Sequence, residues 1–206
     1  QTLPRCPDLK QAEKRLAELK TQAGLLEAGN AKREELLAEA CKLRRKVAFA
    51  NPLLDFNQIL FIKRHFCPNA ETTGNHMCDQ YFGFNAIRGG GLFVLEKPFS
   101  DQPTVRNVLE KSVCENGRYK GQSFTWKDGF LAPELSYDGK EVLFARTEIA
   151  DNEGDRKRYA GQGYETNTYK IFRVKLDGTG LTQLTDGIWN EFDPCYLPSG
   201  RIMFIS

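Results

Sequence analysis

The chain has 206 residues, of which 40% are hydrophobic and 27% charged, and its formal net charge is +2 at pH 7. This composition is that of an ordinary globular protein with one large domain or two small ones. The small net charge argues against nucleic acid as a partner, and the lack of any run of eighteen apolar residues predicts no membrane-spanning helix.

The spacing of the cysteines excludes several kinds of cofactor and redox site. They permit disulfides without requiring them, and no Cys-x-x-Cys pair occurs among them. This spacing excludes a c-type haem attachment site, a thioredoxin-like redox pair and a ribbon-type zinc site within these residues. The six cysteines are Cys6, Cys41, Cys67, Cys78, Cys114 and Cys195.

Residues 1–51 are predicted to form a helical hairpin. Leucines and alanines recur at spacings of three and four over 9–26 and again over 36–50, as they do on the apolar face of a helix. Gly29-Asn30 suits the turn between the helices, and Asn51 before Pro52 suits the end of the second. Both helices are too short for a freestanding coiled coil, so we expect a structural brace that packs on the rest of the protein or on a partner.

Residues 52–125 are predicted to be β-rich. Ile59–Ile62 and Leu92–Leu95 are short apolar runs typical of strands. Three glycines, 89–91, precede the second run, but no Lys-Ser/Thr follows them, so they indicate a turn rather than a phosphate-binding loop.

Both histidines of the chain precede a cysteine by two residues, in His65-Phe-Cys67 and His76-Met-Cys78. Two imidazoles and two thiolates are the ligand set of a tetrahedral zinc site. A disulfide between Cys67 and Cys78 would instead staple the loop between them. The third alternative is that these cysteines are unpaired or bonded elsewhere.

The same segment contains a candidate ligand-binding cluster, formed by His76, Asp79, Gln80 and Tyr81. Its polar groups suit a polar ligand, with His76 or Asp79 available for proton transfer. The alternative is a hydrogen-bonded loop with no ligand.

A repeated pattern begins near residue 126. Pro133–Phe144 has the pattern of a strand, a tight turn at Gly139 and a second strand, and Pro194–Phe204 repeats it around Gly200 with one residue fewer. Between them, 169–176 alternates as a half-buried strand, and Asp177-Gly178 turns it into another at 181–185. Four strands with such turns are typical of a propeller blade, and the charged stretch 149–168 is predicted to be a loop on one propeller face. Both tryptophans, Trp126 and Trp189, are interpreted as blade packing, with a sugar-binding platform as the alternative.

The two motifs resemble the TolB-like propeller repeat, Pro-x-aromatic-Ser-Pro-Asp-Gly-Lys followed by an apolar strand. Tyr137 replaces the proline in the first copy and Ser199 the aspartate in the second. The segments 51–56, 76–83 and 190–198 resemble those of secreted proteins related to the hydrazine synthase alpha subunit. The expected fold is therefore mainly β, with an N-terminal α-helical hairpin at 1–51, a β-rich segment with the His/Cys loop at 52–125, and the start of a TolB-like propeller at 126–206.

This resemblance implies a secreted or periplasmic binding or scaffold module that presents loops to a protein or saccharide ligand. The alternative is a redox enzyme subunit resembling the hydrazine synthase alpha subunit. No cofactor is expected within these residues apart from zinc at the His/Cys pairs. Haem is expected only if sites such as Cys-x-x-Cys-His follow downstream, and such sites would favour the enzyme.

The two ends of the chain carry a further expectation. The chain begins at Gln1 without a Met or an apolar leader, which indicates a processed or shortened product and is consistent with a signal peptide that has been removed. It ends at Ser206 within a predicted apolar strand. Closing a propeller takes at least about four blades of about forty residues each, so the chain is interpreted as truncated and the remaining blades are expected elsewhere in the same protein.

Overall fold

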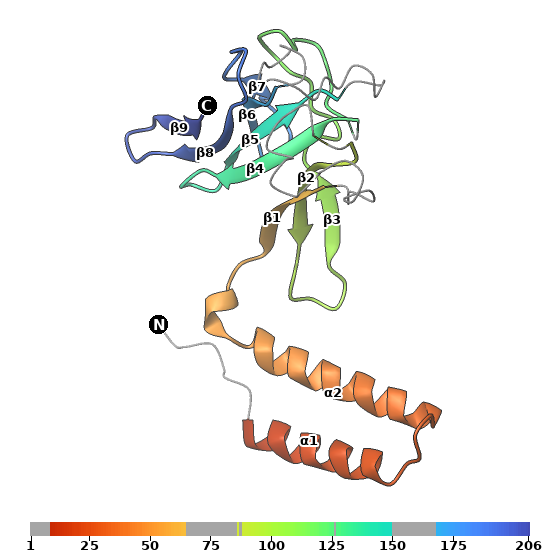
Figure 1. The fold of residues 1–206 in the computed structure, drawn as a ribbon. Coiled ribbons are helices and arrows are strands. Elements are labelled where there is room, and N and C mark those ends of the chain that lie inside the picture. The colour runs from red at the N-terminus through yellow and green to blue at the C-terminus, as the bar shows by residue number, and fades with distance from the viewer. Residues whose placement is uncertain (1–8, 65–85, 87, 126, 150–167) are drawn as a thin grey trace. The chain divides into compact units, whose positions relative to one another are not determined.

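A computed structural model describes residues 9–64, 86, 88–125, 127–149 and 168–206. The chain divides into two compact units, Gln1–Asn57 and Gln58–Ser206, which are described separately. The first unit is helical and the second consists of antiparallel sheets (Figure 1). Among the described residues, no helix combines the length and the hydrophobicity needed to cross a membrane.

The first unit is the predicted helical hairpin. Helix α1 covers Leu9–Gly24, helix α2 covers Ala31–Phe49, and a short 3-10 turn, η1, covers Pro52–Leu54. Gly29 has a φ of +87°, which glycine adopts at little cost, and lets the chain reverse. The Asn30 side-chain oxygen accepts a hydrogen bond of 2.9 Å from the Lys32 N–H, which caps the N-terminus of α2.

The described strands of the second unit form three separate antiparallel sheets. The first has the order β1-β2-β3, the second β4-β5-β6-β7 and the third β8-β9. The bounds are Gln58–Lys63 for β1, Gly91–Glu96 for β2, Thr104–Asn107 for β3, Gly129–Leu135 for β4, Glu141–Thr147 for β5, Lys170–Lys175 for β6, Thr182–Gln183 for β7, Phe192–Tyr196 for β8 and Ile202–Ile205 for β9. The predicted strands near residues 60 and 93 are confirmed. Strand β3 was not predicted, because Thr104–Asn107 contains one apolar residue and has no alternating pattern.

The sheet β4–β7 is buried on both of its faces. On one face Phe130, Phe144 and Phe172 belong to a cluster that also includes Leu92 and Val94 of β2. On the other face a second cluster forms, against which Phe192 of β8 packs. Strand β5 is consequently buried at every position from its second residue to its last, which explains its continuous apolar run.

The hairpin β4–β5 contains a bulge. The register shifts between Leu131 and Glu134, where Ala132 has a φ of +45° and precedes Pro133. Proline cannot donate to the ladder, so within a sheet it is tolerated at an irregularity of this kind. The two strands are joined by a turn in which Gly139 has a φ of +71°.

The hairpin β8–β9 repeats this geometry 61 residues later. Asp193 has a φ of +49°, it precedes Pro194, and the register shifts between Phe192 and Cys195. The turn glycine, Gly200, has a φ of +80°. The sequence repeat is therefore also a repeat in strand pairing. The corresponding pairs are Leu131–Ala145 with Phe192–Ile205, Glu134–Leu143 with Cys195–Met203, and Leu135–Val142 with Tyr196–Ile202.

The turn after β6 generates a stability prediction at Gly178. This residue has a φ of +89°, and a Cβ placed on it would lie 2.6 Å from the Val108 carbonyl oxygen. Gly139 has a similar φ, of +71°, but a Cβ there would meet no atom within 4 Å. Gly139→Ala should cost about 1 kcal/mol through the left-handed backbone alone, whereas Gly178→Ala should cost about 1–3 kcal/mol more because of the overlap.

Urea unfolding of both variants measures this difference. Equal losses of unfolding free energy would show that the turn after β6 does not pack on Val108 as described.

Candidate functional site

All of the site residues proposed from the sequence lie outside the described residues. The zinc site, the Cys67–Cys78 disulfide and the polar ligand cluster therefore stay predictions. Within the described part, Cys41, Cys114 and Cys195 are unpaired, and no three His, Cys, Asp or Glu side chains lie close enough together to hold a metal ion. The residues outside the description are His65, Cys67, His76, Cys78, Asp79, Gln80 and Tyr81.

One edge of the sheet β4–β7 brings together polar groups other than those proposed from the sequence. In an antiparallel sheet, the start of β4, the end of β5, the start of β6 and the end of β7 all lie at the same edge. We call this the loop edge. Asp128, Arg146, Lys170 and Gln183 lie there, and all four are buried. The connection 184–191 leads from this edge to β8.

The first group at the loop edge is a buried ion pair. Arg146 Nη2 lies 2.7 Å from Asp128 Oδ1, and the two side chains are 4% and 7% exposed. The guanidinium carbon lies 4.4 Å from the ring centroids of both Tyr119 and Phe124. Nε and Nη1 of Arg146 have no hydrogen-bond partner within the described structure, and the aromatic faces supply the compensating electrostatic contact.

The surroundings of this pair explain why it is tolerated in the interior. The second carboxylate oxygen of Asp128 accepts a hydrogen bond of 2.8 Å from the Thr125 N–H, so both oxygens are engaged. Burial raises the pKa of Tyr119, and the nearby Arg146 charge opposes that rise in part. The attraction between the two charges and these hydrogen bonds offset part of the desolvation penalty of the pair.

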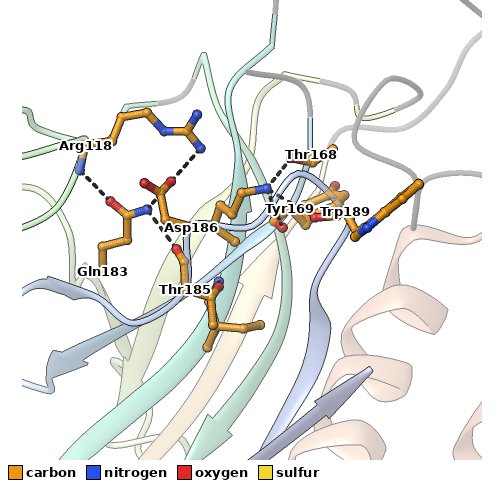
Figure 2. A network of polar contacts seen from close by, with 9 residues as sticks. Arg118, Thr168, Tyr169, Gln183, Thr185, Asp186 and Trp189 are labelled. Carbon is orange, nitrogen blue, oxygen red and sulfur yellow. Dashed lines mark hydrogen bonds and ion pairs between the residues drawn. The ribbon is translucent and has the colours of Figure 1, made fainter. Parts of the chain in front are cut away.

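The second group is a hydrogen-bond network around Gln183 (Figure 2). Its side-chain oxygen accepts from the Arg118 N–H at 2.9 Å, and its side-chain nitrogen donates to the Thr185 carbonyl at 2.8 Å and to Asp186 Oδ1 at 2.9 Å. Arg118 Nη2 lies 2.8 Å from the same Asp186 oxygen. The backbone of Gln183 is held by Asn116 through bonds of 2.7 and 3.0 Å. The start of the connection 184–191 is thereby fixed to the segment before β4.

The third group fixes the other end of that connection. Lys170 is fully buried, and its Nζ donates to the Trp189 carbonyl at 3.2 Å and to the Thr168 hydroxyl. The Asn190 side-chain oxygen accepts from the Tyr169 N–H at 3.1 Å. The Trp189 carbonyl and the Asn190 side chain are therefore tied to the start of β6. The sequence predicts only half-burial for this strand, whereas Lys170 is completely enclosed.

The connection held at both ends presents two large apolar side chains to solvent. Ile188 is 50% exposed and Trp189 is 54% exposed, and the indole extends away from the polar network (Figure 2). We call these two residues the Ile188–Trp189 patch. Trp189 is about half exposed in the described structure, and its interpretation as blade packing stays a prediction. Trp126 lies outside the described residues.

A buried acceptor lies two residues beyond the patch. Glu191 is 8% exposed, and its Oε2 has no hydrogen-bond partner among the described residues. Its other oxygen lies close to Gly187, where an added Cβ would approach to 2.8 Å. The connection therefore packs tightly on this carboxylate, which further restricts the conformations available to Ile188 and Trp189.

The sequence contains one signal for the loop edge, at Arg146. Arg146 follows four consecutive apolar residues, 142–145, and a charge that continues a buried strand has to find a partner inside the protein. Which carboxylate that is cannot be read from spacing, because Asp128 lies 18 positions earlier. The contacts of Lys170 and Gln183 have no sequence signature either.

Comparisons with known proteins add a distant similarity. No protein-family model matches the chain, and neither does any curated protein sequence. Among solved structures, Kuenenia stuttgartiensis hydrazine synthase aligns with 68% of this chain at 18% identity and a TM-score of 0.38. The aligned part spans 13% of the length of that chain.

The buried ion pair generates a stability prediction. Asp128→Asn leaves the Arg146 charge without a counter-charge in the interior and should cost about 3–5 kcal/mol of unfolding free energy. Glu141→Gln is the matched control, because Glu141 lies 3.8 Å from Arg173 with both side chains at least 33% exposed. This change should cost less than about 1 kcal/mol.

Chemical denaturation of the two variants and the wild type checks this prediction. A loss for Asp128→Asn no larger than that for Glu141→Gln would show that Arg146 is not enclosed.

Proposed function

We propose that this chain is part of a secreted or periplasmic propeller protein that acts as a binding module. The sheet β4–β7 is one blade, and β8–β9 begins the next. The repeated bulge, turn and register of the two hairpins support this architecture. The compartment is proposed from the resemblance of the sequence motifs. In a propeller, neighbouring blades bury each other's faces, as both faces of β4–β7 are buried.

The strands of β8–β9 support the same proposal. Met203, Phe204 and Ile205 are 57%, 38% and 51% exposed. The corresponding residues of the hairpin β4–β5, 143–145 of β5, are fully buried between two layers. Further strands of the same propeller would cover β9 as β6 covers β5.

The observation that carries the binding function is the Ile188–Trp189 patch. Tryptophan is over-represented among the residues that dominate binding energy, particularly where an apolar centre has a polar rim. Here Arg118 and Asp186 form polar surface on the same edge, at 29% and 54% side-chain exposure. The backbone of the patch is already fixed by Lys170 and Asn190, so binding costs little ordering of the loop.

A protein is the ligand that this chemistry favours. Ile188 extends the apolar surface beyond the single ring that a sugar would stack on, and the nearby Gln183 network satisfies its own hydrogen bonds. A saccharide site would instead need several polar groups free to bind hydroxyls.

Photo-crosslinking tests the proposal. A benzoylphenylalanine at position 189, introduced in cells that make the complete protein, should crosslink to a defined protein partner. Tyr137 is the matched control position, because it is aromatic, 77% exposed and located at the opposite edge of the sheet. With the partner purified, Trp189→Ala should weaken binding by at least about tenfold.

Other outcomes contradict parts of the proposal. Equal crosslinking from positions 189 and 137 would show that the patch is not a specific surface. A blue shift of Trp189 fluorescence with soluble oligosaccharides, measured in a Trp126→Phe background, would show that the ligand is a saccharide instead of a protein.

A further inference from the structure

The two sides of the helical hairpin differ in chemistry. One side is a groove of about 520 Å³ between α1 and α2 with a largely apolar lining. Lys20, Arg33 and Glu34 line the same groove. The other side carries Arg15, which is hydrogen-bonded to Glu39 at 2.8 Å and paired with Glu18 at 3.0 Å. The apolar lining consists of Leu16, Leu19, Ala23, Leu36, Leu37 and Ala40.

The groove leaves large apolar side chains uncovered. Leu16 is 52% exposed and Leu37 is 65% exposed, whereas Leu19 and Leu36 are the buried leucines of the hairpin in the described structure. Helices of this length are marginal in water unless an apolar face is packed. A contiguous apolar face with a polar rim is characteristic of an interaction surface.

The charges on the groove walls are arranged in a self-complementary way. The Arg15–Glu39 contact shows that residues of α1 and α2 whose numbers add to about 54 lie at the same height in the hairpin. Lys20 and Glu34 meet this condition and lie on opposite walls, and neither forms an ion pair within the part of the chain that is described. Leu16 and Leu37 also lie at nearly equal heights.

We propose that a second copy of this chain occupies the groove and that the two hairpins form a four-helix bundle. The two-fold axis runs parallel to the helices. Each α1 then lies between its own α2 and the α2 of the second copy, and every neighbouring pair is antiparallel, as in up-down-up-down bundles. Leu16 of one copy meets Leu37 of the other, and Lys20 of one copy meets Glu34 of the other, twice.

The charges on the groove walls favour a second copy over a partner whose charges all have the same sign. A strongly acidic helix would be repelled at Glu34, and a strongly basic one at Lys20 and Arg33. A copy of the same hairpin presents opposite charges at equal heights, which fixes its register as well as its orientation.

Sedimentation equilibrium of the full chain with charge-reversal variants tests the proposal. The wild type should be a dimer. Lys20→Glu makes both walls acidic at this height and Glu34→Lys makes both basic, so each should weaken self-association by about tenfold. An equimolar mixture of the two variants should recover much of the wild-type affinity, because the acidic walls of one variant then face the basic walls of the other.

Apolar variants give an independent readout. Leu16→Glu should abolish the dimer, whereas Leu25→Glu should leave it intact, because Leu25 is 83% exposed and lies outside the groove lining. A monomeric wild type would overturn the proposal and show that another segment or partner covers the groove. A dimer that none of these changes weakens would also overturn it, since the association would then use another surface.

Discussion

The burial of sheet β4–β7 on both faces constrains everything else in the second unit. A strand enclosed in this way has no solvent-facing side on which to place charged residues, so its polar groups are confined to the two edges of the sheet. At one edge, tight turns with positive-φ glycines reverse the chain, as at Gly139 and Gly178. At the loop edge, charged side chains enter the interior, and each charge needs a hydrogen-bond or ion-pair partner there.

The buried polar groups at the loop edge also fix the backbone of the connection 184–191. Gln183 holds its first residues and Lys170 holds its last, so the connection is anchored at both ends by groups that are themselves buried. The exposed Trp189 ring is then held on a fixed backbone. Residues placed on rigid supports bind with less loss of conformational entropy, which is why this edge suits recognition.

The fold was predictable where local patterns are strong. The hairpin follows from leucine spacing and from Gly29-Asn30, and the β4–β5 and β8–β9 hairpins follow from proline and turn glycines that recur at matching positions. The bulge at Ala132 was not predicted, because it results from proline inside a paired strand. The sequence also suggests a TolB-like propeller, and the structure supports the coarser description of two N-terminal helices followed by several antiparallel sheets.

The candidate site was not predictable in the same way. Cysteines and histidines are candidate ligands by their chemistry alone, and those of residues 65–81 lie outside the described residues. The loop edge depends on contacts between residues far apart in the chain, such as Arg118 with Asp186 and Arg146 with Asp128. Long-range pairing of this kind leaves no periodicity, and the exposure of Trp189 depends on which strands cover it.

Amide hydrogen exchange measured by NMR tests whether the connection 184–191 is a rigid support. The Glu191 N–H donates to the Tyr169 carbonyl at 3.0 Å, and the Ile171 N–H donates to the Thr185 hydroxyl at 2.9 Å. If the loop edge is rigid, both amides should exchange at rates within about tenfold of those in β5, since they then open only with the sheet. Exchange at the rate of an unstructured peptide would show instead that Trp189 lies on a loop that opens independently of the sheet.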